Sequence, residues 1–456
     1  MKLLDITFKN FRNFEDYQVG LGRKVTVFIG RNGTGKTSII DGIVQSLSFI
    51  FSKQRNTQQY EFIRSTDQGV KSFQTTDPRY IDGDYCYPLS LDVKGEISSD
   101  TVNIPLLWTF EQESKKSGLK DSKFRSAYQT FWEHYNTFEE KPILAFFSDG
   151  FPHKDTNISS AMKDKLKSGN PLPASDGYYQ WDKEQSCVNI WKMFFVQQWI
   201  NNKLNPDEEK AAYVAAINEK LHEFSQPVVK DNNSIDNPIE ELSVDYRNGE
   251  ATLLAVLSDG TKKPFDLLPA GYLRIYSMVL DLASRSYLLN KNTNPEGIVL
   301  IDEIDLHLHP SLEAEILTRL ERSFPRVQLI VSTHSPVAVS NFDQGNSQNG
   351  DYRLISLQRN DEGYCNQIIG NVFGLDYNSS LENVMGTSQQ QKFNRNVRKY
   401  NCRTTKQELY DKTRYNRTIV REACLHDVGR RICPAPSKCR ERNGKSACRG
   451  GTRETL

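Results

Sequence analysis

A glycine-rich loop near the N-terminus constrains this chain more than any other feature. The loop reads Gly30-Arg31-Asn32-Gly33-Thr34-Gly35-Lys36-Thr37, follows the apolar run Val25–Ile29, and precedes a helix-forming segment that opens at Ser38. This is the Walker A order of buried strand, turn and helix. Glycines let successive backbone N–H groups turn toward phosphate oxygens at the positive end of a helix. The loop therefore predicts a nucleotide-phosphate site.

Each residue type in the loop has an expected task. We expect Lys36 to reach the β- and γ-phosphates, and the Thr37 hydroxyl to bind Mg²⁺. The remaining residues that we expect to line the phosphates are Gly30, Asn32, Gly33, Gly35 and Ser38. The predicted cofactors are ATP and magnesium.

Two later apolar segments end in residues that complete such a site. The run Gly297–Ile301 is followed by Asp302 and Glu303. This is the Walker B pattern, in which Asp302 binds Mg²⁺ through water and Glu303 polarises the attacking water. A second run, Val327–Thr333, ends on His334, which we interpret as a switch histidine that senses the γ-phosphate.

Length and composition exclude several classes of protein. The 456 residues suffice for two or three domains, and 37% hydrophobic with 25% charged residues describe a soluble globular chain. No apolar run approaches the length of a membrane span. The N-terminus alternates like a strand and carries Asp5, so it does not resemble a signal peptide. We therefore expect a cytosolic protein without a membrane partner.

The C-terminal residues 401–456 differ from the rest. They hold 14 Lys and Arg against 6 Asp and Glu, net +8, which leaves 44 basic and 51 acidic residues, net −7, before them. They also hold five of the eight cysteines, but no pair has the short spacing of a zinc knuckle. We interpret this tail as a poorly ordered basic extension, even as sequence read out of its ancestral frame. The alternative is a basic surface for nucleic acid or a partner.

The chain divides into four parts by pattern. We predict an N-terminal lobe over 1–55, an insertion over 56–235 that is part strand and largely helical, a C-terminal lobe over 236–395, and the tail over 396–456. Within the insertion we predict helices over 121–140 and 184–224 and a buried strand over 141–147. No repeat and no long heptad arm is visible.

These motifs together resemble the ABC/SMC-type ATPases. The segments are I-T-F-K-N-F-R-N-F at the N-terminus, the loop at 30–37, I-D-E-I-D-L-H-L-H-P from Ile301, and V-S-T-H-S-P from Val331. Within that class the chain is similar to the compact RecF-like and OLD-like members. The resemblance implies an α/β fold: an ABC-type P-loop NTPase head, with a mixed sheet flanked by helices and the lobes separated in sequence. It also implies that two heads enclose two ATP molecules between them.

In such a dimer each loop faces the signature segment of the other subunit. Two segments are candidates. Leu257-Ser258-Asp259-Gly260 sits between apolar runs and is better interpreted as an Asp-Gly hairpin turn. Leu268-Pro269-Ala270-Gly271-Tyr272 opens a helical stretch, so we choose it and expect backbone N–H groups around Gly271 to face the partner's γ-phosphate.

Two features of this region depart from or extend the pattern. Pro269 replaces the usual serine of the signature, which puts fast hydrolysis in doubt but not ATP binding. Asp305 matches the D-loop position that crosses the dimer.

The other polar candidates are two histidines and two glutamines. We expect His307 and His309 to pack at the dimer seam. Neither Gln68 nor Gln74 can be assigned as a Q-loop glutamine.

More narrowly, the segments around Leu268–Arg285 and Val372–Gly386 are similar to the PtuA family, the ATPases of Septu-type and retron-associated anti-phage systems. That resemblance implies a homodimer or higher oligomer, a separate HNH nuclease subunit (PtuB-like), and nucleic acid bound directly or through the complex. An OLD-like nuclease would need a cluster of acidic residues after His334, which is not visible, so we expect no nuclease activity of its own. The replaced signature serine predicts a slow ATPase. The alternatives are a RecF-like ATPase that clamps DNA without a nuclease partner, and a nucleotide-binding scaffold with little hydrolysis.

Overall fold

A computed structural model describes the chain from residue 1 to 374. The gaps within it are 54–59, 67, 99–102, 138–139, 153–157, 169, 184–187, 229–233, 248, 343–349, 361–362 and 371. The cysteine-rich tail and most of the segment 372–386 lie outside the described residues, so the expectations for them stay predictions.

A six-stranded sheet carries the strands that end at the predicted site. Its order is β15-β14-β3-β13-β12-β8, and all neighbouring strands are parallel except β14 and β15. Ile301 pairs with both Val331 and Phe147, and Ser332 pairs with Phe28, so four strands end at one edge. The strands are β3 (Val25–Gly30), β8 (Ile143–Phe147), β12 (Gly297–Ile301), β13 (Val327–Ser332), β14 (Tyr352–Asn360) and β15 (Gly363–Ile369).

Strands β8, β12 and β13 are buried along their whole length. Such burial is typical of parallel strands that are covered on both faces, and it explains why their sequences are continuous apolar runs. The mixed sheet flanked by helices confirms the predicted α/β fold class.

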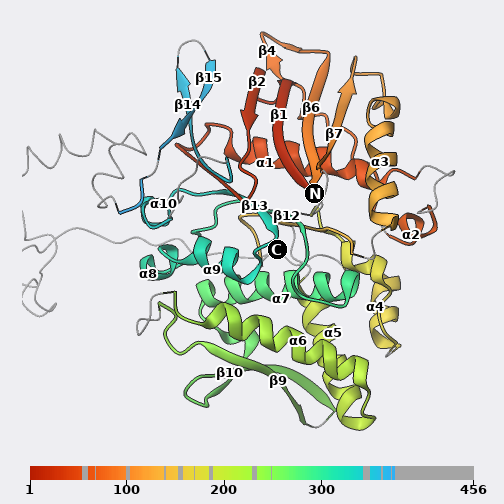
Figure 1. The fold of residues 1–456 in the computed structure, drawn as a ribbon, viewed down its shortest axis with the longest axis vertical. Helices are drawn as coiled ribbons and strands as arrows, with labels where there is room; N and C mark the ends of the chain where they lie inside the picture. The colour runs from red at the N-terminus through yellow and green to blue at the C-terminus, as the bar shows by residue number, and fades with distance from the viewer. Residues whose placement is uncertain are drawn as a thin grey trace, which may run out of the picture. The chain divides into compact units, whose positions relative to one another are not determined.

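A four-stranded antiparallel sheet lies above the central one in Figure 1, with helix α1 (Lys36–Leu47) between them. Its order is β2-β1-β6-β7. Gly42 permits the close approach of α1, because a Cβ there would lie 2.5 Å from the Phe8 ring. The strands are β1 (Lys2–Phe11), β2 (Phe14–Gly20), β6 (Leu89–Ser98) and β7 (Asn103–Gln112), and the hairpin β4 (Tyr80–Ile81) with β5 (Asp84–Tyr85) extends beyond them.

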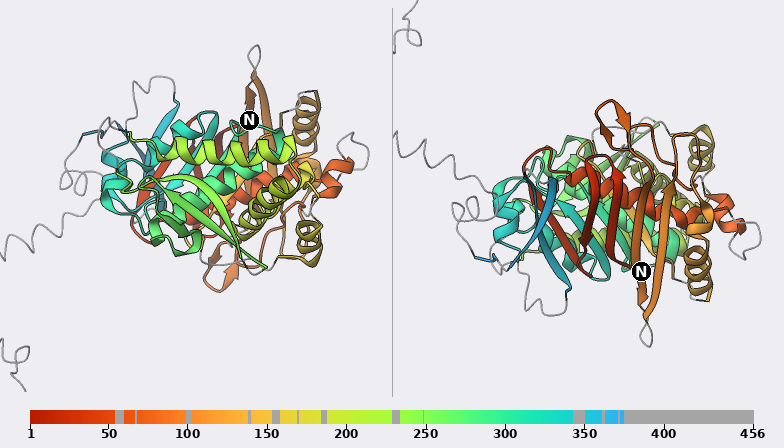
Figure 2. Two further views of the ribbon diagram at one scale, coloured as in Figure 1. Left: turned by 90° about the horizontal axis from the view of Figure 1, so that it is seen from below. Right: turned by 90° about the horizontal axis from the view of Figure 1, so that it is seen from above.

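Helix α7 (Ala270–Asn290) covers the opposite face of the central sheet. Helices α5 (Val188–Leu204) and α6 (Glu208–Ser225) pack on α7, and a three-stranded sheet packs on them in turn. The two views of Figure 2 show this green helical layer and the red and orange antiparallel sheet on opposite faces. The outer sheet consists of β9 (Ile239–Arg247), β10 (Glu250–Leu257) and β11 (Lys262–Pro264), and the other helices are α2 (Tyr60–Ser65), α3 (Arg125–Thr137), α4 (Ser160–Lys167), α8 (Pro310–Glu313), α9 (Ile316–Ser323) and α10 (Pro336–Ser340).

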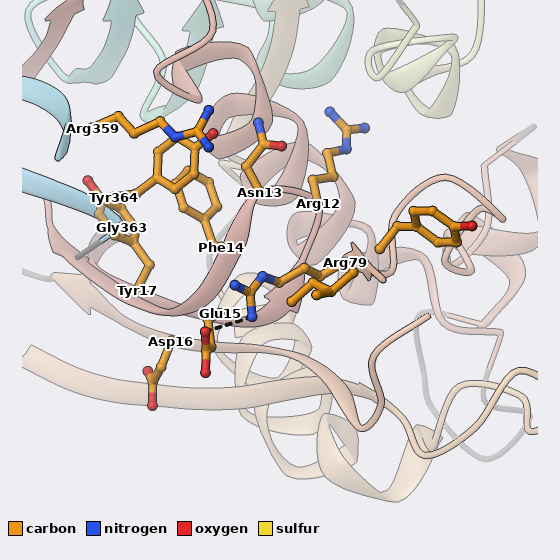
Figure 3. Close-up of a pocket in the computed structure, with 12 residues that line it drawn as sticks. Arg12, Asn13, Phe14, Glu15, Asp16, Tyr17, Arg79, Arg359, Gly363 and Tyr364 are labelled. Carbon is orange, nitrogen blue, oxygen red and sulfur yellow. Dashed lines mark hydrogen bonds and ion pairs between the residues drawn. The ribbon is translucent and has the colours of Figure 1, made fainter. Parts of the chain in front are cut away.

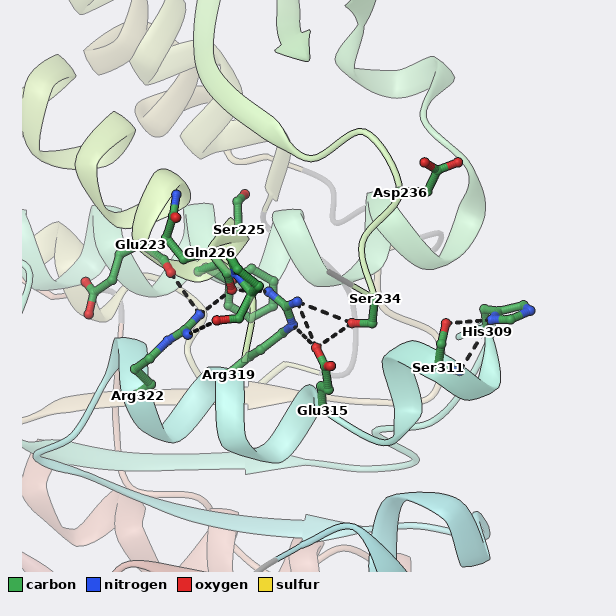
Figure 4. A network of polar contacts seen from close by, with 12 residues as sticks. Glu223, Ser225, Gln226, Ser234, Asp236, His309, Ser311, Glu315, Arg319 and Arg322 are labelled. Atoms are coloured by element: carbon green, nitrogen blue, oxygen red, sulfur yellow. Dashed lines mark hydrogen bonds and ion pairs between the residues drawn. The ribbon is translucent and has the colours of Figure 1, made fainter. Parts of the chain in front are cut away.

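Two arginines of α9 bind the C-terminal end of α6 (Figure 4). The fully buried Arg319 donates to the carbonyl oxygens of Phe224 (2.8 Å) and Gln226 (2.7 Å) and pairs with Glu315 (2.8 Å). Arg322 donates to the Glu223 carbonyl at 3.1 Å. The last carbonyls of a helix have no partner within it, so these bonds supply one.

The local sequence predictions agree with the described elements. The Asp-Gly turn between β10 and β11 is confirmed, since Gly260 N–H donates to the Leu257 carbonyl at 2.8 Å. The strand expected over 141–147 is β8, and α3, α5 and α6 lie in the expected helical segments. The region 56–235 supplies β6, β7 and β8 to sheets that it shares with both ends of the chain. The four-part division itself stays a prediction. No helix in the described residues is long and apolar enough to cross a membrane.

Candidate functional site

The glycine-rich loop connects β3 to α1 at the edge where the central strands end. Gly33 and Gly35 have φ angles of 81° and 96°, which glycine adopts without strain. A Cβ at Gly35 would lie 2.5 Å from the Phe14 ring, so the loop also needs glycine for packing. Asn32 and Gly33 are exposed, Thr37 is exposed and Ser38 half-buried at the start of α1. The predicted phosphate-lining residues thus form one open loop at a helix N-terminus.

The Lys36 side chain is buried under this loop. Its Nζ donates to the carbonyl oxygens of Gly30 (2.8 Å) and Arg31 (3.2 Å). Burial lowers the pKa of Lys36, and the charges of Asp302 and Glu303 oppose that shift. The ammonium therefore lies between the loop and the acidic end of β12, where an anionic ligand would be attracted.

The two residues expected to bind Mg²⁺ are in direct contact. Thr37 Oγ1 donates to Asp302 Oδ2 at 2.8 Å, and the other carboxylate oxygen of Asp302 accepts from the Ser332 hydroxyl. A hydroxyl and a carboxylate suit Mg²⁺, which prefers oxygen ligands and takes the rest from phosphates and water. Among the described residues, no three His, Cys, Asp or Glu side chains gather as a protein-only metal site. The set fits a magnesium ion that arrives with a nucleotide.

Glu303 follows Asp302 in an unusual backbone conformation. Its φ is 52°, in the left-handed region that non-glycine residues rarely adopt. Its N–H donates to Ser332 Oγ at 2.9 Å. Burial raises the pKa of Glu303, and the nearby charges of Asp302, Asp305 and Asp149 raise it further. A carboxylate with a raised pKa at a phosphate site can accept a proton from water.

Three participants were not predicted from the sequence. Ser332 bonds both Asp302 and Glu303. Asp149 lies two residues after the end of β8, the strand beside β12. Arg274, on α7, donates to the carbonyl oxygens of Asp302 and Glu303, each at 3.1 Å. Only the parallel pairing of β8 with β12, between residues far apart in sequence, brings Asp149 to this edge.

The predicted switch histidine lies beside Lys36. Burial lowers the pKa of His334, the Lys36 charge lowers it further, and the charge of Asp305 opposes the shift, so the imidazole is neutral at pH 7. The Asp305 carboxylate accepts from Thr333 Oγ1 (2.6 Å) and from the His334 N–H (3.2 Å). In the single chain, Asp305 is thus bonded to the switch segment.

The chosen signature segment forms the first turn of α7. Pro269 is the N-cap residue, and no side chain caps this end of the helix. A Cβ at Gly271 would lie 2.5 Å from the His307 carbonyl oxygen, so glycine is needed for this backbone approach. His307 itself has a φ of 66°. The signature turn and the segment after Glu303 are therefore in van der Waals contact within one chain.

The remaining polar candidates have local partners. His309 Nδ1 accepts from the Ser311 N–H at 3.3 Å and caps α8 (Figure 4). Gln68 lies beside Asp182, and the Gln74 N–H donates to Asp77 at 2.7 Å. Packing of His307 and His309 at a dimer seam stays a prediction, and no Q-loop glutamine is assigned.

A pocket of about 650 Å³ lies near the glycine-rich loop, and Phe14 contacts both (Figure 3). Phe14, which packs on Gly35, forms part of its wall. Arg79 is paired with Glu15 at 2.7 Å, and Arg359 lies over the Tyr364 ring at 5.4 Å from its centroid. The wall is formed by the β1–β2 turn, β4 and the β14–β15 hairpin. Arginines and aromatic rings offer stacking and hydrogen bonds to a planar, polar ligand.

Comparison with known proteins gives one family and several relatives. The family model described as "AAA ATPase domain" matches residues 1–339. The retron Vc95 probable ATPase of Vibrio cholerae serotype O1 biovar El Tor is 24% identical over 379 residues, covering 75% of this chain and 71% of that protein. The Septu protein PtuA of Bacillus mycoides is 41% identical over 78 residues, which is 17% of this chain and 11% of that protein. Among solved structures, the SMC head domain from Thermotoga maritima is similar with a TM-score of 0.40 and 11% identity, covering 81% of this chain and 100% of that one.

Proposed function

The chain belongs to the AAA ATPase domain family, and from this membership we propose that it is an ATPase that dimerises around Mg²⁺-ATP and regulates a partner HNH nuclease in anti-phage defence. The partner and the defence role are supported by the similarity to retron ATPases and to a Septu PtuA protein. They rest also on the resemblance of the Leu268–Arg285 segment to the PtuA family.

One observation carries the ATPase proposal. Thr37 and Asp302, which are 265 positions apart, are 2.8 Å from each other at the loop where Lys36 is buried. In P-loop NTPases, a hydroxyl and a carboxylate bind the Mg²⁺ ion and a lysine ammonium binds the phosphates of the nucleoside triphosphate. Mg²⁺ would be held by Thr37 and Asp302, and it would supply charge neutralisation for the β- and γ-phosphates.

The remaining residues have roles in the transfer of the γ-phosphate to water. Glu303 would orient a water molecule and accept its proton. The neutral His334 would contact the γ-phosphate. Its backbone N–H donates to Asp305, so a movement of His334 on γ-phosphate binding would also move Asp305. The nucleoside would occupy the pocket beside Phe14. Gly271 and Asp305 of a second copy would close the site.

Turnover and self-association, measured together, test the proposal. We expect the purified chain to hydrolyse ATP slowly, and light scattering to give a dimer or higher oligomer with Mg²⁺-ATP and a smaller species without it. Co-expression with an HNH protein encoded beside its gene should yield a complex whose DNA cleavage depends on ATP.

Each contrary result points to a different alternative. ATP binding without turnover would favour a nucleotide-binding scaffold. Turnover stimulated by duplex DNA, with no nuclease in the complex, would favour a RecF-like clamp.

A further inference from the structure

Arg274 is a buried cation that joins three segments behind the site. It lies in the second turn of α7 and its side chain is 0% exposed. Within the part of the chain that the structure describes, its guanidinium donates only to backbone carbonyl oxygens. These are Ser148 (3.3 Å from both Nη1 and Nη2), Asp149 (3.4 Å), Phe151, Asp302 (3.1 Å) and Glu303 (3.1 Å).

These carbonyls lie at the ends of two neighbouring strands. Ser148 to Phe151 follow β8, while Asp302 and Glu303 follow β12. A planar guanidinium can serve both groups at once because its donors spread in a fixed fork, whereas a lysine ammonium is a single point. Burial lowers the pKa of Arg274 to about 10, so the cation persists at neutral pH. Its Nε is buried without a partner, a cost that the other bonds offset.

The carbonyls at β12 belong to a strained turn. Glu303 has its φ of 52°, and such a conformation persists only where the surroundings impose it. The Glu303 N–H donates to the Ser332 hydroxyl oxygen. The Glu303 carbonyl oxygen accepts from Arg274 and from the Leu306 N–H (3.1 Å). Without the guanidinium, the carbonyl oxygens of Asp302 and Glu303 would lose a charged hydrogen-bond donor, which would destabilise this turn.

We propose that Arg274 is a positioning residue that fixes the turn at Glu303 and joins it to the first turns of α7. The role assigned to Glu303 rests on the proposed function; the structural link between α7 and the turn does not. Because Arg274 lies one turn beyond Gly271, a shift of the signature turn would be transmitted through one side chain to the direction of the Glu303 carboxylate. Nucleotide held by a second copy could thus act on hydrolysis in the first.

The test compares two buried arginines of the same helix. Arg285 is 2% exposed, pairs with Asp281, and donates to the carbonyls of Gly177 and Tyr179 at 3.0 Å each. The variants are Arg274→Lys and Arg285→Lys, with thermal melting, ATP affinity by a fluorescent analogue, and kcat as readouts. We expect both to melt at lower temperature than wild type. Only Arg274→Lys should lower kcat, on the order of 100-fold with ATP affinity little changed, as misplacement of a catalytic group does.

Hydrogen exchange supplies a readout that does not depend on turnover. In Arg274→Lys the amides of Asp302, Glu303 and Ile304 should exchange faster than in wild type, while those of β13 should not, and Arg285→Lys should leave this turn unchanged. A wild-type protein without turnover would refute the proposed function, and the exchange data would still decide the role of Arg274.

Three results would overturn the inference. The first is wild-type exchange at residues 302–304 in Arg274→Lys, and the second is a kcat equal to that of Arg285→Lys. If Arg274→Lys does not fold, Arg274→Gln is tested in its place. The third result is that neither Arg274 variant folds while Arg285→Lys does, which would show that Arg274 is required for folding and is not a positioning residue.

Discussion

Thr37 Oγ1 donates to Asp302 Oδ2 at 2.8 Å, so a hydroxyl at the start of α1 and a carboxylate at the end of β12 share one hydrogen bond across 265 positions of chain. The same carboxylate accepts from Ser332 with its other oxygen. Both atoms that would face a magnesium ion are therefore held in place by the protein.

Replacing Thr37 by alanine should raise the magnesium requirement of turnover. We expect the Mg²⁺ concentration for half-maximal ATP hydrolysis to increase roughly 10–100-fold, because a ligand hydroxyl and a partner of Asp302 are lost together. Thr37→Ser keeps the hydroxyl and is the matched control, expected close to wild type. Equal magnesium curves for the alanine variant and wild type would contradict the assignment.

Replacing Lys36 by alanine should strongly lower the affinity for ATP. The variant removes a buried ammonium that lies between the loop and the acids of β12. Loss of a charged hydrogen bond weakens binding by at least roughly 10–100-fold. Fluorescence titration with an ATP analogue measures this, and Lys9→Ala, which changes an exposed side chain of β1, serves as the control. An unchanged affinity in Lys36→Ala would refute the loop as the phosphate site.

Replacing Glu303 by glutamine should separate binding from hydrolysis. The amide cannot accept a proton from water, so turnover should fall by roughly 10²–10⁴-fold while ATP still binds. The ATP-bound oligomer should then accumulate, which size-exclusion chromatography with light scattering would detect. If wild type and Glu303→Gln hydrolyse ATP at the same rate, another group is the base.

Replacing Gly271 by alanine should destabilise the protein although it lies in a helix. Alanine normally favours a helix over glycine by about 1 kcal/mol. Here its Cβ would lie 2.5 Å from the His307 carbonyl oxygen, and such overpacking costs about 1–3 kcal/mol. Denaturant unfolding should show a lower free energy of unfolding than for Gly118→Ala, where a Cβ meets open space. A stabilised Gly271→Ala would show that the backbone contact is absent.

The sequence predicts those parts of the site whose residues are consecutive. The loop at 30–37, the acids after Ile301 and the histidine after Thr333 each follow a continuous apolar run, so strand and strand end are visible together. The Asp-Gly turn at 259–260 is local in the same way, and so is the helix after Pro269.

The unpredicted parts depend on contacts between distant segments. Asp149 reaches the site because β8 pairs with β12, and no local pattern specifies that neighbour. In the sequence, Arg274 is one of several polar residues in a predicted helix, and nothing local marks it as buried. Only the packing of distant segments brings five carbonyl oxygens around its guanidinium. The reason for glycine at 271 is similarly a contact with His307.

The strand order has a consequence for biosynthesis. β3 leaves the ribosome early, but its sheet neighbours β13 and β14 begin about 300 residues later. At the usual translation rate of about 5–20 residues per second, an apolar strand waits on the order of 15–60 s for its permanent neighbours. The N-terminal half cannot complete the central sheet during synthesis. The yield of folded protein in cells should therefore depend on the contacts that cover β3 until β13 and β14 have been synthesised.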